Sequence, residues 1–259
     1  MVLIAVAGGT GTAGRAAVEQ AVASGCAVRS LSRHLPAEGD RVGGADYAQA
    51  DFRTGQGVAA GLAGVDALIE TLDARSGAPL RALPVTSVAV LAAAARAGVS
   101  RCVLLTIVRA AECSMGYYQV QGARALSYES AAIPTTVVYA TQFHNLVAGI
   151  FAAGGKVGVV PVLRGVSFQP ISTSDVASVL VQEALAGGDE HRKVVIGGPE
   201  IKTMKELAQE WQSATGSKAV VTGLPFPGSF GAFLRAGKNL VPEHAIGRLG
   251  FGEWLRARP

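Results

Sequence analysis

The chain has 259 residues, of which 49% are hydrophobic and 16% are charged, so it is long and apolar enough for one α/β domain with a large core. The formal net charge of +4 comes from scattered residues, which favours anionic cofactor phosphates over nucleic acid as the partner. The three cysteines lack metal-ligand spacing, and we expect reduced, mostly buried thiols of a cytoplasmic protein. No apolar run approaches about 20 residues without Gly, Pro or a charge, so we expect no membrane span.

The chain opens with an apolar strand, Val2 to Ala7, that leads directly into a glycine-rich turn and then a helix from about Thr12. Glycine lets the backbone turn tightly and approach a pyrophosphate with no side chain in the way. The helix directs its unsatisfied N–H groups and positive dipole end toward the phosphates. We therefore predict a nucleotide-binding turn, with a purely structural strand–turn–helix as the alternative. Its candidate residues are Gly8, Thr10, Gly11, Thr12, Ala13 and Gly14.

Strands and helices alternate along the first half of the chain. The further predicted strands are 27–31, 47–50, 65–70, 101–107 and 135–139, and the predicted helices are 12–24, 85–97 and 117–131. Pro79 and Pro84 are expected at or before the start of the second helix, where proline is tolerated. This βαβ series predicts a doubly wound parallel sheet with helices on both faces.

Beyond Thr141 the pattern is looser. It indicates strands at 168–171, 193–196 and 219–222 and helices at 173–185 and 203–215. Ser172 and Asp175 resemble a capping box with Asp in place of Glu. We expect one domain over 1–259, in which about 141–259 forms a small cap on the substrate side. The segment Gly223–Gly237 is rich in Gly, Pro and Phe.

The end of the second strand indicates which cofactor the turn would bind. An NAD site usually has an acid there for the ribose 2′-hydroxyl, but this chain has Arg33, which would pair with a 2′-phosphate. We therefore favour NADP(H); the alternative is a solvated Arg33. Asp51 and Phe52 are expected at the adenine, or else in a plain strand-end turn, and Thr71 is also assigned to the cofactor.

Several short motifs occur in order over nearly the whole chain. They are Gly8 to Arg15, Val28 to Arg33, Asp51-Phe52, Gly64 to Leu68, Tyr117-Tyr118, Gln142-Phe143, Gln169-Pro170 and Asp175-Val176. Together they resemble the NmrA-like group of atypical short-chain dehydrogenases/reductases. The resemblance implies a Rossmann fold that binds NADP(H). The group includes quinone and isoflavone-type reductases, tailoring enzymes of natural-product pathways, and redox sensors without catalysis.

The chain departs from the Tyr-x-x-x-Lys pattern of this superfamily, because Tyr117 is followed by Gln121. Glutamine would still bond the ribose, but it carries no charge to stabilise a phenolate. Thr106 stands near the usual Ser position and would orient a substrate oxygen. Arg124 is predicted on the Gln121 side of the helix. Tyr118 is the alternative to Tyr117, because only one of two adjacent helical residues faces the cofactor.

The segment after the sixth strand is expected at the edge of the sheet where nicotinamide and substrate meet. Thr141, Gln142 and Phe143 are assigned to the cofactor. His144 is a candidate proton donor, with a solvent-facing histidine at a helix start as the alternative. An apolar pocket or plain core is expected from Phe143, Phe168, Phe226, Phe230 and Phe233.

Three functions remain open. The favoured one is an NADP(H)-dependent oxidoreductase acting on a hydrophobic carbonyl, enone or quinone. The others are a non-catalytic NADP(H)-binding redox sensor or regulator, and a Rossmann-fold enzyme reused for a non-redox cyclisation or dehydration. A small hydrophobic substrate is expected as the partner, and a homodimer is one assembly considered; nucleic acid, membrane and metal are not expected. No G-x-S-x-G elbow or P-loop ending occurs in the sequence, which argues against hydrolase and NTPase chemistry.

Overall fold

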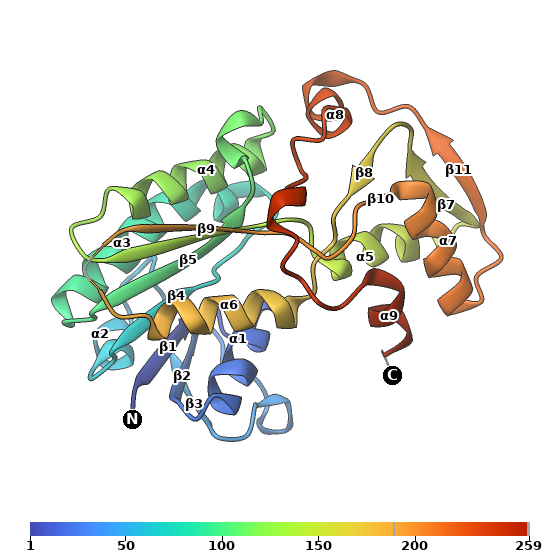
Figure 1. Ribbon diagram of the computed structural model, residues 1–259. Helices are drawn as coiled ribbons and strands as arrows, with labels where there is room; N and C mark the ends of the chain where they lie inside the picture. The colour runs from blue at the N-terminus through green and yellow to red at the C-terminus, as the bar shows by residue number, and fades with distance from the viewer. Residues whose placement is uncertain (189, 258–259) are drawn as a thin grey trace. The chain divides into compact units, whose positions relative to one another are not determined.

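The computed structural model describes residues 1–188 and 190–257. Within them, seven strands form one sheet in the order β3-β2-β1-β4-β5-β6-β9 (Figure 1). The strands are β1 (Leu3–Ala7), β2 (Ala27–Ser32), β3 (Ala45–Gln49), β4 (Ala67–Glu70), β5 (Arg101–Ile107), β6 (Thr135–Ala140) and β9 (Arg192–Ile196). The pairs β1–β2, β1–β4, β2–β3 and β4–β5 are parallel.

The chain divides into two compact units. Unit 1 comprises Met1–Thr106, Gly116–Val138 and Val176–Val194, and unit 2 comprises Ile107–Met115, Tyr139–Asp175 and the chain from Val195 onward. In unit 1, helices α3 and α4 pack together on one face of the sheet, and α1 and α6 lie on the other (Figure 1), as the doubly wound prediction requires. These helices, with the short α2, are α1 (Thr12–Ala23), α2 (Val58–Leu62), α3 (Gly77–Arg96), α4 (Gly116–Glu129) and α6 (Thr173–Leu185).

The first strand and helix show why the sheet forms here. Residues Ile4 to Ala7 of β1 are fully buried, as expected for a central parallel strand covered on both faces. Helix α1 buries Ala17, Val18 and Ala21 and ends just before Gly25, whose φ of 76° is one that glycine adopts readily. The predicted end of this helix is confirmed to within one residue.

Helix α3 corrects the prediction that a helix starts at residue 85. It begins at Gly77 and continues through Pro84, although Pro84 has no N–H to bond the carbonyl four residues earlier. Burial of Leu83, Val90 and neighbouring residues offsets that local cost, since packing outweighs propensity in most helices. By length and composition, α3 alone among the described helices is apolar enough to cross a membrane. This is weak evidence for a membrane span, because α3 packs on α4 and the core helix of a protein can pass the same test.

Unit 2 contains some elements that the sequence pattern predicted and others that it did not. Its helices are α5 (His144–Gly155), α7 (Met204–Thr215), α8 (Gly228–Arg235) and α9 (Phe251–Arg256), and its remaining strands are β7 (Val159–Leu163), β8 (Ser167–Phe168), β10 (Lys202–Thr203) and β11 (Val220–Leu224). Strand β11 pairs in parallel with β7, and β10 pairs antiparallel with β8. The predicted strand 168–171 is reduced to β8, and α8 forms inside the segment rich in Gly, Pro and Phe.

The cap that starts α6 partly confirms the predicted capping box. Ser172 Oγ accepts from the Asp175 N–H at 3.0 Å and donates to Asp175 Oδ2 at 2.8 Å. The same Oδ2 accepts from the main-chain N–H groups of Arg248 and Leu249. Asp175, which itself belongs to unit 2, therefore holds the main chain at Arg248 and Leu249 of the same unit.

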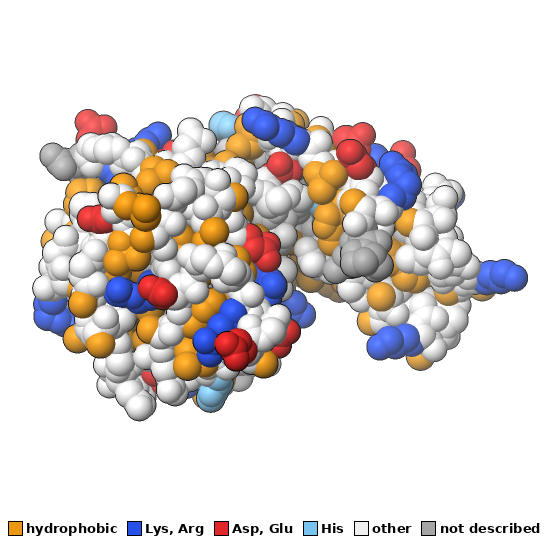
Figure 2. Space-filling model, turned by 90° about the horizontal axis from the view of Figure 1, so that it is seen from below, with side chains coloured by type: hydrophobic (Ala, Val, Ile, Leu, Met, Phe, Trp, Pro, Cys, Tyr) orange, Lys and Arg blue, Asp and Glu red, His pale blue; other side chains and the backbone are white. Residues whose placement is uncertain are grey.

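Surface composition agrees with the scattered charge of the sequence. On the face shown in Figure 2, acidic and basic side chains are interspersed with hydrophobic ones. The cysteines are free thiols, with Cys102 and Cys113 buried and Cys26 half-buried.

Candidate active site

The glycine turn after β1 is built by close contacts between backbones. Gly8 has a φ of 84°, and its carbonyl accepts from the Gly11 N–H at 2.9 Å. A Cβ on Gly14 would lie 2.1 Å from the Gly8 oxygen, and one on Gly9 would lie 2.3 Å from Ser30 Oγ. These glycines therefore allow α1 to sit directly against β1 and β2.

The outer side of the same turn is open. Thr10, Gly11 and Thr12 are exposed, while Ala13 is half-buried. A Cβ on Gly11 would contact only the Gly8 oxygen, at 3.3 Å. No side chain caps α1, and its first turn has no acid. This uncapped N-terminus, with two exposed hydroxyls beside it, fits an anionic pyrophosphate.

Arg33 follows β2 directly and is exposed. Its main-chain oxygen accepts from Gln49 Nε2 at 2.9 Å, but its guanidinium has no ion-pair or hydrogen-bond partner within the described part of the chain. The five donors of Arg33 are therefore available to a phosphate. Its role with a 2′-phosphate stays a prediction.

The other predicted cofactor residues of unit 1 are partly engaged in the protein itself. Asp51 Oδ1 accepts from the Arg53 N–H at 2.8 Å and closes the strand-end turn. Phe52 is buried, and Thr71 Oγ1 donates to the Ala7 oxygen at 3.0 Å. Contacts of these residues with a cofactor stay predictions.

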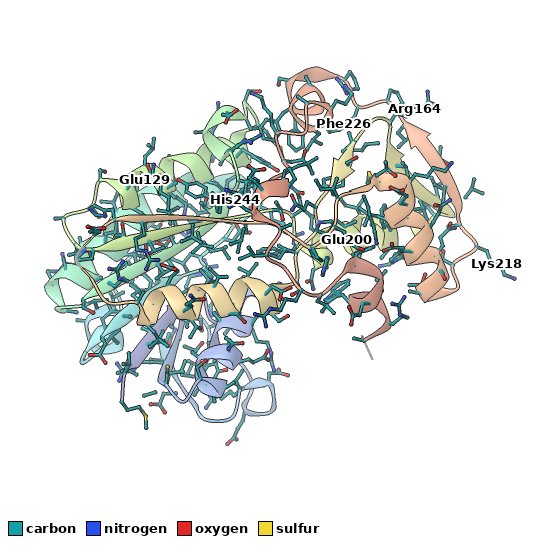
Figure 3. The ribbon with its side chains drawn as sticks, viewed as in Figure 1. Glu129, Arg164, Glu200, Lys218, Phe226 and His244 are labelled. Atoms are coloured by element: carbon teal, nitrogen blue, oxygen red, sulfur yellow. The ribbon has the colours of Figure 1, made fainter. Side chains whose placement is uncertain are left out.

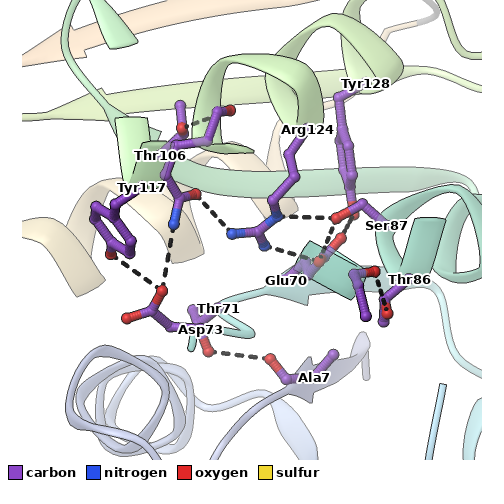
Figure 4. Close-up of polar contacts among 12 residues, drawn as sticks. Ala7, Glu70, Thr71, Asp73, Thr86, Ser87, Thr106, Tyr117, Arg124 and Tyr128 are labelled. Carbon is purple, nitrogen blue, oxygen red and sulfur yellow. Dashed lines mark hydrogen bonds and ion pairs between the residues drawn. The ribbon is translucent and has the colours of Figure 1, made fainter. Parts of the chain in front are cut away.

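Tyr117, at the start of α4, faces a carboxylate that the sequence pattern did not single out. Its hydroxyl donates to Asp73 Oδ1 at 3.0 Å, and Gln121 Nε2 donates to the same oxygen at 3.3 Å (Figure 4). Burial, together with the negative charge of Asp73, raises the pKa of Tyr117 far above its usual 10. Tyr117 therefore stays protonated and acts as a hydrogen-bond donor. Tyr118 is the more buried of the two tyrosines.

A buried ion pair lies behind Gln121. The Oε1 of Gln121 accepts from Arg124 Nη1 at 2.7 Å, which confirms that Arg124 lies on the Gln121 side of α4. Arg124 Nη2 pairs with Glu70 Oε1 at 2.8 Å, and the two side chains are 1% and 0% exposed. Ser87 and Tyr128 complete the pair's hydrogen bonds (Figure 4). We call the whole set, Glu70, Asp73, Ser87, Tyr117, Gln121, Arg124 and Tyr128, the Tyr117 cluster.

Gln121 and Thr106 are less accessible than the sequence suggested. Gln121 is 3% exposed, and both ends of its amide are bonded within the cluster. Thr106 is also buried, and its hydroxyl donates to the Gln121 carbonyl at 3.3 Å. The predicted contacts of Gln121 with a ribose and of Thr106 with a substrate oxygen stay predictions. The contact of Thr106 would require its bond to the Gln121 carbonyl to be exchanged, whereas Gln121 Nε2 has a second N–H to offer.

The remaining candidates lie in unit 2 and are mostly buried. Thr141 Oγ1 donates to the Gln169 oxygen at 2.6 Å. Gln142 and Asn239 form two long amide contacts of 3.4 and 3.5 Å, and Phe143 is the N-cap residue of α5. Their cofactor contacts stay predictions.

His144 does not face solvent, so the predicted alternative of a solvent-facing histidine at a helix start is wrong. It is 0% exposed, its Nε2 bonds the Leu249 oxygen at 2.9 Å, and its ring packs on Phe251 and Trp254. Burial lowers the pKa of His144 below 6.5. The imidazole is neutral near pH 7, and its role as a proton donor stays a prediction.

The predicted aromatic group divides between core and surface. Phe168 and Phe233 are buried. Phe226, in the loop before α8 (Figure 3), has its ring centroid 5.8 Å from that of Phe230, which stacks on Phe233 at 6.3 Å. These three rings therefore form one contiguous aromatic group around α8.

Comparison with known proteins adds to this geometry. A family model described as NAD(P)H-binding matches residues 8–186, which is more than half of the chain. A search of curated protein sequences found no match. Within the described residues, no group of three or more His, Cys, Asp and Glu side chains is placed to hold a metal ion.

Several solved structures have a similar fold. The NADPH-dependent quinone oxidoreductase QOR2 of Escherichia coli is 17% identical, with a TM-score of 0.75 over 97% of this chain and 98% of that one. The triphenylmethane reductase of Citrobacter sp., complexed with NADP(H), is 18% identical, with a TM-score of 0.70 over 98% and 94%. The UDP-glucose 4-epimerase of Thermus thermophilus, complexed with NAD, is 16% identical, with a TM-score of 0.73 over 98% and 97%. At these identities the likeness shows a shared fold.

Proposed function

This chain belongs to the NAD(P)H-binding family, as its resemblance to the NmrA-like reductases predicted, and from that premise we propose that it is an NADP(H)-dependent reductase of a hydrophobic carbonyl, enone or quinone. The observation that carries the proposal is the uncapped, open glycine turn beside the unpaired guanidinium of Arg33. Together they offer donors to a pyrophosphate and to a 2′-phosphate.

The proposal assigns roles to residues of this chain. The N–H groups at the start of α1 would hold the pyrophosphate, and Arg33 would hold the 2′-phosphate. The bound cofactor would supply a hydride. Tyr117 would border the acceptor and keep its proton, because its hydroxyl donates that proton's hydrogen bond to Asp73. A quinone or enone suits this site, because water can protonate the reduced product.

Two of the similar structures support a reductase. One is named an NADPH-dependent quinone oxidoreductase, and the other a triphenylmethane reductase complexed with NADP(H). The epimerase, in contrast, is complexed with NAD. The choice of NADP(H) for this chain therefore rests on Arg33.

Replacement of Arg33 by Ala tests the cofactor assignment. We expect NADPH binding to weaken by about 10- to 100-fold, the worth of hydrogen bonds to a charged group, while NADH binding changes much less. Isothermal titration calorimetry with both nucleotides measures the two affinities. Arg96→Ala, which removes the same charge from the end of α3, is the control. Equal losses for NADPH and NADH would refute the 2′-phosphate assignment.

A non-catalytic NADP(H) sensor is the second candidate. The observation that favours it is the Tyr117 hydroxyl bonded to Asp73, with Gln121 in place of a charged lysine. Absorbance of the nicotinamide band with a panel of quinones and enones separates the two functions. Oxidation of NADPH supports the reductase, whereas tight binding of NADPH and NADP⁺ without turnover supports the sensor.

A further inference from the structure

Asp73 lies three residues beyond the end of β4, at the carboxyl edge of the parallel strands, where open α/β sheets bind ligands. Its side chain is exposed. Oδ1 accepts from Tyr117 and Gln121, while Oδ2 has no hydrogen bond or ion pair within the described residues. One oxygen of Asp73 is therefore held in place, and the other is free to face a ligand.

The buried residues of the Tyr117 cluster, Arg124 and Glu70, set the orientation of the Gln121 amide that holds Asp73. Arg124 has only donors, so the Gln121 oxygen must face Arg124 and the Gln121 N–H groups must face Asp73. The charge of Arg124 is balanced by Glu70 at 2.8 Å. The uncompensated charge of the cluster is therefore the negative charge of Asp73.

This geometry opposes proton donation to a substrate. The Tyr117 O–H points at the Asp73 carboxylate, so loss of its proton would leave two negative charges about 3 Å apart. Reduction of a neutral carbonyl needs a proton as well as a hydride. Reduction of a cation needs the hydride alone.

We propose that the acceptors this site takes best are cationic electrophiles, namely iminium ions or delocalised carbocations, whose positive charge Asp73 balances. The inference rests on the proposed NADP(H)-dependent reductase. The cationic carbon gains a C–H bond from the hydride of dihydronicotinamide, which is oxidised to NADP⁺. In an iminium the C=N π pair becomes the nitrogen lone pair, and the product is a neutral amine. No proton is transferred.

The charge of Asp73 acts mainly on binding. It attracts the acceptor before the reaction, and the attraction is lost as the hydride neutralises the cation. Asp73 therefore lowers KM for a cation and eases release of the neutral product, without raising kcat. A structural role for Asp73 would not give this split between KM and kcat.

Three probes test the inference: a cationic triarylmethane dye, its sulfonated anionic analogue and a neutral naphthoquinone. Absorbance titration without cofactor measures dye binding, and NADPH oxidation measures kcat and KM. We expect the wild-type protein to prefer the cationic dye over the sulfonated one. Asp73→Asn should reduce that preference about tenfold and raise KM for the cation by a similar factor, as expected for one screened charge pair. Asp73→Glu should restore both.

Asp46→Asn is the matched control, because it removes an exposed carboxylate of unit 1 from β3. If Asp46→Asn lowers the preference as much as Asp73→Asn does, or if neither lowers it, the inference is overturned. Turnover of the quinone without turnover of the cation overturns the inference and leaves the proposed function standing. No NADPH oxidation with any acceptor overturns the proposed function, and the inference with it.

Discussion

The ion pair of Glu70 and Arg124 places two charges in the interior of unit 1, 0% and 1% exposed. Removal of one partner leaves the other charged, buried and uncompensated. We expect Glu70→Gln or Arg124→Met to lower the free energy of unfolding by about 3–5 kcal/mol, as measured by urea denaturation.

The double variant tests whether the charges of Glu70 and Arg124 are coupled. Glu70→Gln with Arg124→Met leaves no isolated charge, so its loss should be well below the sum of the two single losses. The pair of Lys193 and Glu129, in which Lys193 is 63% and Glu129 20% exposed, is the control, and Lys193→Met should cost less than about 1 kcal/mol. Additive losses in the double variant would show that the two charges are not coupled.

The sequence predicted only part of this cluster. The side of α4 on which Arg124 lies followed from its spacing to Gln121, because residues three apart are neighbours on a helix. Glu70 and Asp73 were missed, because they contact α4 across 54 and 44 residues of chain. Such pairings arise from sheet order, which local periodicity does not encode. A lone acid at the end of the apolar run of β4 was the one available signal.

Among the helices, α1 offers a test of which glycines serve packing and which face a ligand. Ala at position 14 would place its Cβ 2.1 Å from the Gly8 oxygen, so we expect Gly14→Ala to destabilise the protein by about 3 kcal/mol, the upper end for overpacking. Gly11 has a φ of −76° and open space outside it, so Gly11→Ala should keep the stability and weaken NADPH binding. Thermal unfolding and calorimetry measure the two effects.

Gly149, in α5, is the control for a plain glycine-to-alanine change. Nothing lies within 4 Å of its Cβ position, and Gly149→Ala should stabilise the helix by about 0.5–1 kcal/mol. If Gly11→Ala bound NADPH as tightly as the wild-type protein, the outer face of the turn would not be the nucleotide site.

Predictions of helices and strands succeeded where local pattern and tertiary burial agree. The bounds of β5 and α6 match the predicted ranges, because each has a continuous apolar pattern between clear boundaries. The start of α3 was missed because Pro84 signals a boundary that packing overrides. Helix α8 was not predicted, because the Gly and Pro residues around it hide its short apolar pattern.

For the chain as a whole, the two units do not follow the order of the sequence. We predicted a cap from about residue 141, and the second of the three segments of unit 2, Tyr139–Asp175, begins close to that position. However, Val176–Val194 returns to unit 1, and Ile107–Met115 belongs to unit 2. Periodicity shows that α6 is a helix but does not show which unit it joins.

The stability of unit 2 should depend on pH through His144. Burial lowers the pKa of His144 below 6.5, and this outweighs the opposite effects of the Leu249 carbonyl and Asp175. Below about pH 6.5 the unfolded chain therefore binds a proton that the folded chain refuses. The contribution of neutral His144 is fully present above pH 6.5. It is lost as the pH falls from 6.5 toward the lower pKa of the folded state, with a slope of at most about 1.4 kcal/mol per pH unit.

His144→Gln removes the titrating group and keeps an N–H that can bond the Leu249 oxygen. We expect the free energy of unfolding of this variant to vary less between pH 6.5 and 5 than that of the wild-type protein, as measured by urea denaturation at each pH. His34→Gln, which removes an exposed imidazole, should keep the wild-type slope. An unchanged slope in His144→Gln would mean that the imidazole gains its proton without loss of folded structure. Its positive charge would then have to be offset by the carboxylate of Asp175 or by water reaching the ring past Phe251 and Trp254, because a buried charge needs a partner.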